Sequence, residues 1–311
     1  MAATGYTSVD DLFDNLGQVQ VYEELGDFCA FSVNHYDERP EFMDTVYFGE
    51  PGNMKSVDIS FGEMNQPPDQ TLQITEKYIY YFAYDYEVKT ESSVTIVQIP
   101  RDGSEVVTKK IFFADIGFPY LYNGNFIENT FVDGDNLFML GGFMLSAEQQ
   151  QFEFYIMAYN LKTDEFDVYK TQDFKGMGKL FRYGDGLGVM TALYDERGYF
   201  SEMGVRFLNF DEDSCRLSVK GDLPFAQSEN WTYDMSVDGK HFYCIDDTLC
   251  GILTNKDNAS SFMYVEIDLK TGAVSTCIPF AKNTDKENKG LVLGSMLIRD
   301  GGMAVSEHNC S

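Results

Sequence analysis

Apolar and polar residues alternate along most of this chain, in short runs that are separated by turn-forming residues. Phe152, Phe154 and Ile156 occupy every second position before one such turn. Phe166 and Val168 continue the alternation after it. A period of two places one face of an extended segment in a core and the other in solvent. The pattern therefore predicts antiparallel β-strands that are joined by tight turns.

Five polar turns recur at nearly constant spacing. The turn Asn-Leu-Lys-Thr-Asp, which begins at Asn160, is matched further along the chain by Asp-Leu-Lys-Thr-Gly at Asp268. Related turns begin at Gly49, Pro100 and Asn209, which makes the five slots almost evenly spaced. Asn, Asp and Gly tolerate positive φ or bond to their own backbone, and Pro presets φ at a corner. Each slot is interpreted as a turn between two strands of a repeated unit.

A second repeated marker is the dipeptide Asp-Gly, which is followed within a few residues by an apolar run. Its copies begin at Asp133, Asp185, Asp238 and Asp300, and so recur at a spacing similar to that of the polar turns. Earlier units keep the apolar run, at 28–31 and 78–82, without the dipeptide. Each unit is therefore predicted to run strand, turn, strand, loop, strand, turn, strand.

Four strands in each repeated unit of roughly 50 to 60 residues resemble the blades of WD40-like and kelch-like β-propeller repeats. In those repeats an Asp-Gly turn separates the first two strands, and a polar turn separates the last two. The resemblance covers roughly residues 18–305. It implies an all-β propeller of four-stranded antiparallel blades, six in number, with five or seven as alternatives. It brings no catalytic residue with it.

The two ends of the chain raise the question of how the ring closes. Five units are complete, and the sixth stops after its second strand, at Val305. Because closure hides sheet edges, we expect either that residues 1–25 complete the last blade or that the chain is a piece of a longer protein. Gln18 to Tyr22 alternates as a strand, and Ser8 to Gly17 has the pattern of a short capped helix. The expected organisation is a helical closing segment over 1–17 and a propeller domain over 18–311.

The charge of the chain limits its partners. The sequence holds 50 Asp and Glu against 23 Lys and Arg, a formal net charge of -27. Such a surface repels nucleic acid phosphates and anionic lipid headgroups. It favours a basic protein or peptide as partner, bound by a soluble monomer.

No segment of the sequence has the pattern of a membrane span or a leader. The longest apolar stretch runs only from Leu137 to Leu145, whereas about 20 residues are needed to cross a bilayer. The first basic residue is Arg39, so no basic n-region of a signal peptide is present. We expect a cytoplasmic protein; secretion after removal of a signal is the alternative.

Six cysteines are spread through the chain without a C-x-x-C pair, which argues against a zinc cluster or a dense disulfide framework. We expect reduced, packed thiols. Cys244 and Cys250 are the only close pair, and a bridge between them would suit an oxidising compartment. Glycosylation sequons at Asn230 and Asn258 would suit the same alternative.

The motifs of the common enzyme classes are absent. The sequence contains no G-x-S-x-G, H-E-x-x-H or G-x-x-x-x-G-K-[ST] motif. Its three histidines, His35, His241 and His308, have no local context for nucleophilic catalysis. No catalytic residue, metal ligand or cofactor is predicted. Calcium is the alternative, but the acidic pattern over 283–290 departs from calcium-loop spacing and is interpreted as a solvated loop.

An aromatic stripe occurs at period two. Its members are Tyr78, Tyr80, Phe82, Tyr84 and Tyr86. They share one face of a single strand, where they could stack on sugars or bases or could fill the space between two blades. We expect them to be core residues.

Any ligand site is expected at the mouth of the propeller channel, as the resemblance implies. The candidate residues lie in the segments that lead into the innermost strands of the third, fourth and fifth blades. They are Tyr120, Tyr122, Asn125, Lys175, Arg182, Asn230, Trp231 and Tyr233. Trp231 is the only Trp of the chain, and Trp is enriched at binding hot spots.

Two classes of function fit these observations. The first is a noncatalytic interaction scaffold that binds a basic protein or peptide. The alternative is a carbohydrate-active or other hydrolytic propeller with paired carboxylates at the channel mouth. A calcium-stabilised surface module is a third interpretation.

Overall fold

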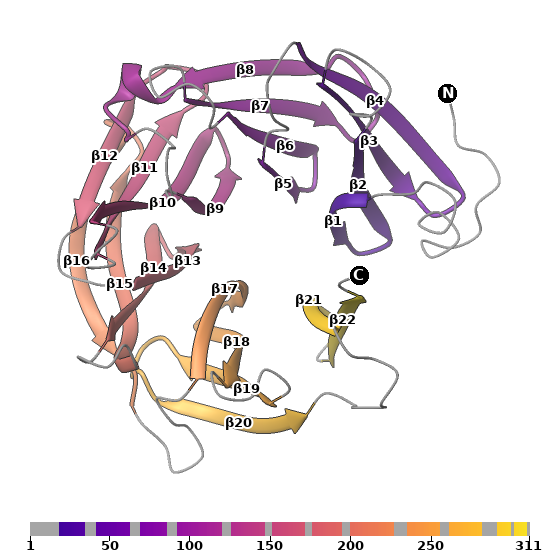
Figure 1. Cartoon of the computed structure of the whole chain (residues 1–311). Coiled ribbons are helices and arrows are strands. Elements are labelled where there is room, and N and C mark those ends of the chain that lie inside the picture. The colour runs from indigo at the N-terminus through magenta and orange to yellow at the C-terminus, as the bar shows by residue number, and fades with distance from the viewer. Residues whose placement is uncertain are drawn as a thin grey trace. The chain divides into compact units, whose positions relative to one another are not determined.

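The computed structural model describes residues 19–34, 42–62, 69–85, 92–119, 126–146, 151–171, 176–194, 200–226, 235–255, 261–281, 291–299 and 302–309. Strands make up most of this part of the chain (Figure 1). One short 3-10 helix, η1 (Phe113–Ile116), follows the eighth strand. The chain divides into two compact units. No helix among the described residues is long and apolar enough to cross a membrane.

Unit 1 comprises residues 1–125 and 130–134. It contains two four-stranded antiparallel sheets, in which consecutive strands are neighbours. The first sheet holds β1 (Val19–Leu25), β2 (Phe28–Asn34), β3 (Phe42–Glu50) and β4 (Asn53–Gly62). The second holds β5 (Asp69–Ile74), β6 (Tyr78–Asp85), β7 (Ser93–Pro100) and β8 (Val107–Phe112).

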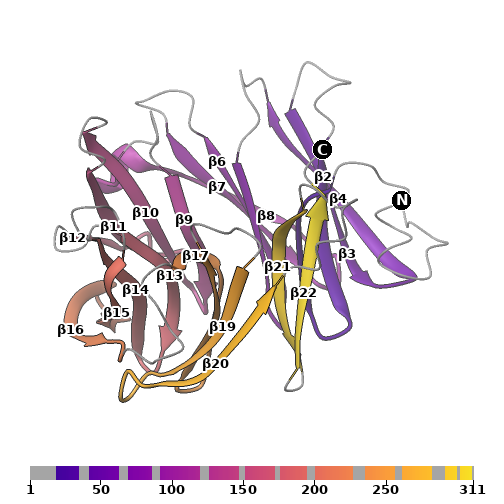
Figure 2. The same ribbon diagram turned by 60° about the horizontal axis from the view of Figure 1, so that its bottom comes forward.

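Unit 2 comprises residues 126–129 and 135–311. It contains most of three further four-stranded meanders and a two-stranded hairpin. The meanders are β9 (Phe126–Asp133), β10 (Asn136–Ser146), β11 (Gln151–Asn160) and β12 (Phe166–Thr171); β13 (Gly176–Tyr183), β14 (Gly186–Tyr194), β15 (Phe200–Asp211) and β16 (Arg216–Pro224); and β17 (Met235–Ile245), β18 (Thr248–Asn255), β19 (Ser261–Asp268) and β20 (Val274–Ala281). Strands β21 (Leu291–Arg299) and β22 (Gly302–Asn309) lie side by side as the hairpin (Figure 2).

The structure confirms the predicted all-β repeat and most of its turns. All five polar slots, including those at Asn160 and Asp268, join the third and fourth strands of a sheet. The Asp-Gly markers at Asp133 and Asp185 fall at the ends of β9 and β13, where the chain turns into the second strand. Five complete four-stranded sheets and one two-stranded sheet are present in the described part of the chain.

One predicted turn of the repeat was wrong. Asp238 lies inside β17, where the register with β18 shifts between Val237 and Phe242. The turn of this sheet is formed instead by Asp246 and Asp247. At the other end of the chain, β1 pairs with β2 in the first sheet, so residues 19–25 are not the part of the segment 1–25 that could complete the last blade. The helix predicted within 1–17 lies outside the described residues.

Two glycines in unit 2 lie beneath aromatic rings of the neighbouring strand. Gly188 of β14 pairs with Phe181 of β13, and Gly251 of β18 pairs with Phe242 of β17. A Cβ at Gly188 would lie 2.4 Å from a ring carbon of Phe181, and one at Gly251 would lie 2.2 Å from Phe242. Each glycine thus lets an inner-strand aromatic ring rest directly on the backbone of the second strand, at equivalent places in two successive sheets.

The aromatic stripe of β6 is a core feature, as predicted. Tyr80 and Phe82 are buried and stack with their ring centroids 6.4 Å apart. Tyr84 is fully buried, and its hydroxyl donates to Thr130 at 2.6 Å. Burial raises the pKa of Tyr84 to about 12. Tyr86 lies outside the described residues. The stripe therefore packs the interior of unit 1, and its rings are not available as a sugar platform.

A buried polar network joins the two sheets of unit 1. Asp44 of β3 is fully buried, and its Oδ2 accepts hydrogen bonds from the Tyr81 hydroxyl and, at 2.8 Å, from the Gln70 amide. Gln70 lies in β5, and Tyr81 lies in β6. Buried polar groups are retained where partners satisfy them. This network fixes β3 against the second sheet from within the apolar core.

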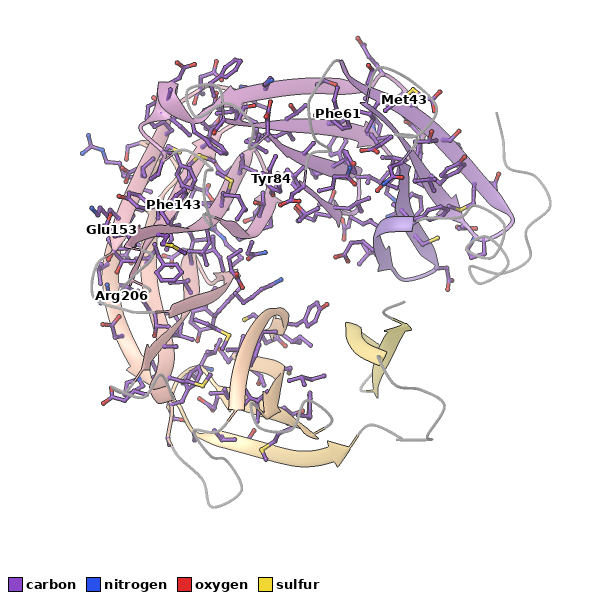
Figure 3. The ribbon with its side chains drawn as sticks, viewed as in Figure 1. Met43, Phe61, Tyr84, Phe143, Glu153 and Arg206 are labelled. Atoms are coloured by element: carbon purple, nitrogen blue, oxygen red, sulfur yellow. The ribbon has the colours of Figure 1, made fainter. Side chains whose placement is uncertain are left out.

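A buried arginine joins two sheets of unit 2 (Figure 3). The Arg206 side chain of β15 is 8% exposed. Its Nε and Nη2 donate to the two carboxylate oxygens of Asp222 at 2.7 and 2.8 Å, and its Nη1 donates to the Tyr169 hydroxyl at 2.9 Å. Tyr169 belongs to β12 of the preceding sheet. The planar guanidinium therefore bonds to groups of both sheets.

No disulfide joins the cysteines that the structure describes. They are Cys29, Cys215, Cys244 and Cys250. Cys244 pairs in register with Leu249, and Cys250 pairs with Tyr243, so the two thiols that the alternative would join are unbridged. Burial raises the pKa of Cys244 to about 11, which keeps this thiol protonated at neutral pH.

Candidate binding surface

The polar turns of unit 2 share one hydrogen-bonding plan. The Oδ1 atom of Asn160 accepts backbone N–H bonds from Lys162 and Thr163, each at 3.0 Å. Asp268 accepts the corresponding bonds from Lys270 and Thr271 at 2.8 Å. These bonds are why Asn and Asp recur at this place in the repeat, because their short side chains reach the backbone two and three residues on. The N–H groups of Lys270 and Thr271 lower the pKa of Asp268 below its ordinary value.

Each of these turns is fastened to the first turn of its own sheet. The Leu161 N–H donates to the Asp135 carbonyl at 2.8 Å, and Lys162 pairs with the Asp135 carboxylate at 2.7 Å. In the sheet of β17 to β20, the Leu269 N–H donates to the Asp247 carbonyl at 2.8 Å, and Lys270 pairs with the Asp247 carboxylate. The first turn and the polar turn of a sheet therefore lie side by side at the same end of its strands, which we call the turn edge.

Asp247 also joins two neighbouring sheets of unit 2. Its Oδ1 accepts a hydrogen bond from the Tyr183 hydroxyl, at the end of β13, at 2.9 Å. The pairing with Lys270, followed by the bond from Tyr183, lowers the pKa of Asp247. Burial and this carboxylate raise the pKa of Tyr183 to about 12. The turns of the two sheets are thus held at a common edge by a charged network.

The connections at this edge carry a strong excess of negative charge. We define the acidic turn edge as the residues that join first to second and third to fourth strands in unit 2. Among the described residues, its charged members are eight acidic and two basic: Asp135, Lys162, Asp164, Glu165, Asp185, Glu212, Asp213, Asp246, Asp247 and Lys270. Both lysines pair with carboxylates of the same edge. The edge therefore presents a negative field to solutes.

Of the eight residues predicted for the channel mouth, the structure describes one. Arg182 lies near the end of β13 and not in the segment that leads into that strand. Its Nη2 pairs with Glu212 at 3.1 Å, and its guanidinium carbon lies 5.9 Å from the Phe210 ring centroid. Arg182 is therefore a neighbour of the acidic turn edge. The other seven residues, from Tyr120 to Tyr233, lie outside the described residues.

A Lys in the polar turn and an Asp in the first turn of the same sheet form a sequence pattern that predicts their pairing. The lysine in both copies of the Leu-Lys-Thr motif pairs with an Asp of the first turn of its own sheet, Asp135 for Lys162 and Asp247 for Lys270. An Asp in the first turn of a unit therefore predicts that this turn contacts the Lys of the polar turn in the same unit. Asp246 and Asp247 form the turn between β17 and β18.

Residues of metal-ligating type do not cluster in the described part of the chain. There, no group of three or more His, Cys, Asp and Glu residues is placed to hold a metal ion. Gly176 to Lys179, which resembles a phosphate loop only partly, forms the start of β13. The acidic pattern over 283–290 lies outside the described residues.

Acid is expected to weaken the fold through the turn aspartates. The folded-state pKa of Asp268 is lowered, so its contribution is present above the unfolded-state pKa and is lost as pH falls through the folded-state value. Asp268→Asn should fold normally, because Asn160 fills the equivalent place, and should lose less stability between pH 6 and pH 3 than the wild type. Urea midpoints at the two pH values measure this. Equal losses in both proteins would contradict the assignment.

The comparisons with known proteins define the class of fold. No protein-family model and no curated protein matches the sequence. The structure is similar to the β-propeller domain of the Trilobed protease from Pyrococcus furiosus, described as having an open velcro topology, with a TM-score of 0.52 and 12% identity over 94% of this chain and 79% of that one. Together with the repeated four-stranded antiparallel sheets, this likeness identifies the fold as a β-propeller.

The structure also has a weaker similarity to an enzyme from another organism. Cobalt-substituted Synechocystis apocarotenoid oxygenase is similar with a TM-score of 0.46 and 10% identity, over 81% of this chain. The present chain spans 58% of the length of that oxygenase. The fold assignment rests on the protease propeller domain.

Proposed function

We propose that this chain is a noncatalytic propeller scaffold whose acidic turn edge binds a basic protein or peptide. The observation that carries the proposal is the balance of eight acidic against two basic residues at that edge, with both lysines paired internally. A WD40-like or kelch-like repeat class is part of the same proposal. It is supported by the Asp-Gly and polar turns that frame the sheets at Asp133, Asp185, Asn160 and Asp268.

Charge complementarity determines the amino-acid composition of the expected partner. A surface of one sign speeds encounter with an oppositely charged partner and rejects partners of like charge. Because the edge is solvent-facing, its attraction is screened over about 8 to 10 Å at physiological salt. The expected partner is therefore a lysine- and arginine-rich segment that binds tightly at low salt and dissociates in moderate salt.

Neutralising the edge should weaken binding of a basic probe. The probe is a fluorescent ten-residue peptide of alternating Lys and Gly, followed by anisotropy at low and at moderate salt. The variant Asp185→Asn/Asp213→Asn/Asp246→Asn removes three exposed charges at turn positions that Asn accepts. We expect roughly tenfold weaker binding, as the loss of about 1.4 kcal/mol over three contacts implies.

A matched variant separates this edge from overall charge. Asp27→Asn/Glu50→Gln/Glu105→Gln changes net charge by the same amount on exposed residues of unit 1. It should retain binding within about twofold, or about 0.4 kcal/mol. Equal weakening in both triple variants would show that only the net charge of the chain attracts the peptide, and the proposed surface would be wrong.

The hydrolytic alternative gains no support from the described residues. Glycoside hydrolysis uses two carboxyl groups about 5 to 10 Å apart across the scissile bond. A pocket formed by described residues of unit 1 has a single carboxyl group in its lining, that of Asp85. The hydrolytic alternative, which places its carboxylates at the channel mouth, stays a prediction.

A further inference from the structure

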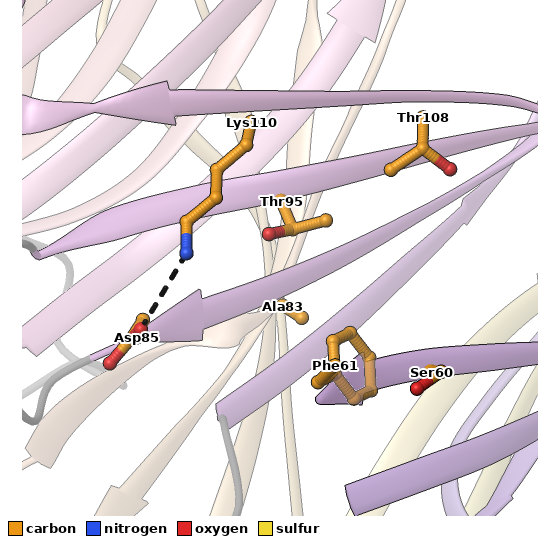
Figure 4. Close-up of a pocket in the computed structure, with 7 residues that line it drawn as sticks. All are labelled: Ser60, Phe61, Ala83, Asp85, Thr95, Thr108 and Lys110. Carbon is orange, nitrogen blue, oxygen red and sulfur yellow. Dashed lines mark ion pairs between the residues drawn. The ribbon is translucent and has the colours of Figure 1, made fainter. Parts of the chain in front are cut away.

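A pocket lies between the end of β4 and the face of the second sheet in unit 1 (Figure 4). Its volume is about 230 Å³. Its lining combines two opposite charges, three hydroxyl groups and two apolar side chains. The residues are Ser60, Phe61, Ala83, Asp85, Thr95, Thr108 and Lys110.

Strand register brings these residues to one face of the second sheet. Ala83 of β6 pairs with Thr95 of β7, and Thr95 pairs in turn with Lys110 of β8. Asp85 lies two residues beyond Ala83, and Thr108 lies two before Lys110, so both share that face. From the first sheet, Phe61 of β4 stacks on Tyr81 with ring centroids 6.3 Å apart. The pocket is therefore built from regular strands.

The two charged groups are close but not tightly bonded to each other. Lys110 Nζ lies 3.9 Å from Asp85 Oδ2, and their side chains are 45% and 22% exposed. A charge-assisted hydrogen bond has a shorter separation of about 2.7 to 2.9 Å. The ammonium group of Lys110 also lies 5.2 Å from the centroid of the Phe112 ring. Both side chains are partly exposed, so solvent reaches both charges.

We infer that this pocket binds a zwitterionic α-amino acid with an apolar side chain. Backbone bond lengths place the ammonium and carboxylate ends of an amino acid about 3 Å apart. This spacing allows the ligand carboxylate to pair with Lys110 while its ammonium pairs with Asp85. The side chain of the ligand then packs against Phe61 and Ala83.

Charge and size exclude the simpler ligands. A plain anion at Lys110 would be repelled by Asp85, and a plain cation at Asp85 would be repelled by Lys110, because the two charges are neighbours. A zwitterion satisfies both. The volume of the pocket is about 230 Å³. That space suits a single amino acid and is below the range of drug-sized ligands.

The test uses L-leucine as the probe and the full chain as the receptor. Isothermal titration calorimetry measures its binding by the wild type, alongside N-acetyl-L-leucine, which lacks the ammonium, and L-leucine methyl ester, which lacks the carboxylate. We expect saturable binding of leucine with a Kd of about 1 mM or tighter, and at least tenfold weaker binding of both derivatives. Glucose is added as a neutral ligand that could use the hydroxyl groups, and it should not bind.

Variants identify the pocket as the place of binding. Asp85→Asn and Lys110→Met should each weaken leucine binding roughly tenfold or more, because each removes one charged partner. Lys109→Met is the matched control, since Lys109 pairs with Ile96 and points to the opposite face of the sheet. It should bind leucine within about twofold of the wild type. Thermal unfolding of each variant confirms that it folds.

The outcomes separate cleanly. Absence of saturable leucine binding by the wild type up to about 10 mM would overturn the inference, as would binding of glucose or of both derivatives as strongly as leucine. Unchanged leucine binding by Lys110→Met or equal loss in Lys109→Met would also overturn it. The inference is independent of the proposed function, because it concerns unit 1 and the acidic turn edge belongs to unit 2.

Discussion

Gly251→Ala is expected to lower the free energy of unfolding by about 3 kcal/mol, which is the upper part of the range for overpacking a core. The added Cβ would lie 2.2 Å from Cδ1 and Cε1 of Phe242. Phe242 is fully buried and shares the core cluster of unit 2 with Leu249 and Val265, so its ring has little room to move aside. Urea unfolding followed by circular dichroism measures the change.

Gly221→Ala is the matched control for this substitution. Gly221 lies in β16 of the same unit, and a Cβ there would meet no atom within 4 Å. Because glycine in a strand costs about 0.5 to 1 kcal/mol relative to alanine, this variant should be neutral or slightly stabilised. Equal destabilisation by the two substitutions would show that the contact with Phe242 is not the cause. Gly188→Ala, beneath Phe181, should behave like Gly251→Ala.

Arg206→Met is expected to destabilise the protein by about 2 kcal/mol, because methionine keeps much of the aliphatic packing but loses the hydrogen bonds of the guanidinium. The bonds removed are the pair to Asp222 and the one to Tyr169. Removing one partner of a fully buried ion pair costs about 3 to 5 kcal/mol. The Asp222 side chain is 47% exposed, so water can solvate the carboxylate that remains, and the loss is smaller.

Lys162→Met provides the contrast for the buried arginine. Lys162 also pairs with a carboxylate at 2.7 Å, but its side chain is 72% exposed. Exposed pairs contribute about 0 to 1 kcal/mol because water screens them and long side chains lose entropy on ordering. The urea midpoint of this variant should stay close to that of the wild type. If both substitutions had the same effect, burial would not be the property that gives the Arg206 pair its strength.

The repeat could be predicted from sequence because its turns are local. The Asn160 and Asp268 side chains bond to N–H groups two and three residues ahead, so a few adjacent residues hold all the information for the turn. The same holds for the alternation of Phe154 and Ile156, which are buried on one face of β11. The turn residues and the alternation of apolar with polar residues therefore predicted the strands and the interval along the sequence at which the four-stranded unit repeats.

Short sequence patterns did not predict the features that depend on which strands pair and in which register. The Asp-Gly dipeptide at Asp238 has the chemistry of a turn, but β17 continues through it with a shift in register against β18. Strand β1 was predicted as a strand, yet the alternation over 18–22 does not state which neighbour it joins. Its pairing with β2, in which Tyr22 lies opposite Phe31 in register, depends on residues outside that segment.

By itself, the sequence determined the fold class, the five polar turns and the negative charge, since each depends on residue type and short-range spacing. Only the tertiary structure decided which charges meet. Asp247 contacts Tyr183 and Lys270 from different strands, and Phe61, Asp85 and Lys110 line one pocket although they come from three strands. Such sites arise from register and from the stacking of sheets. A one-residue shift in register would move each side chain to the opposite face.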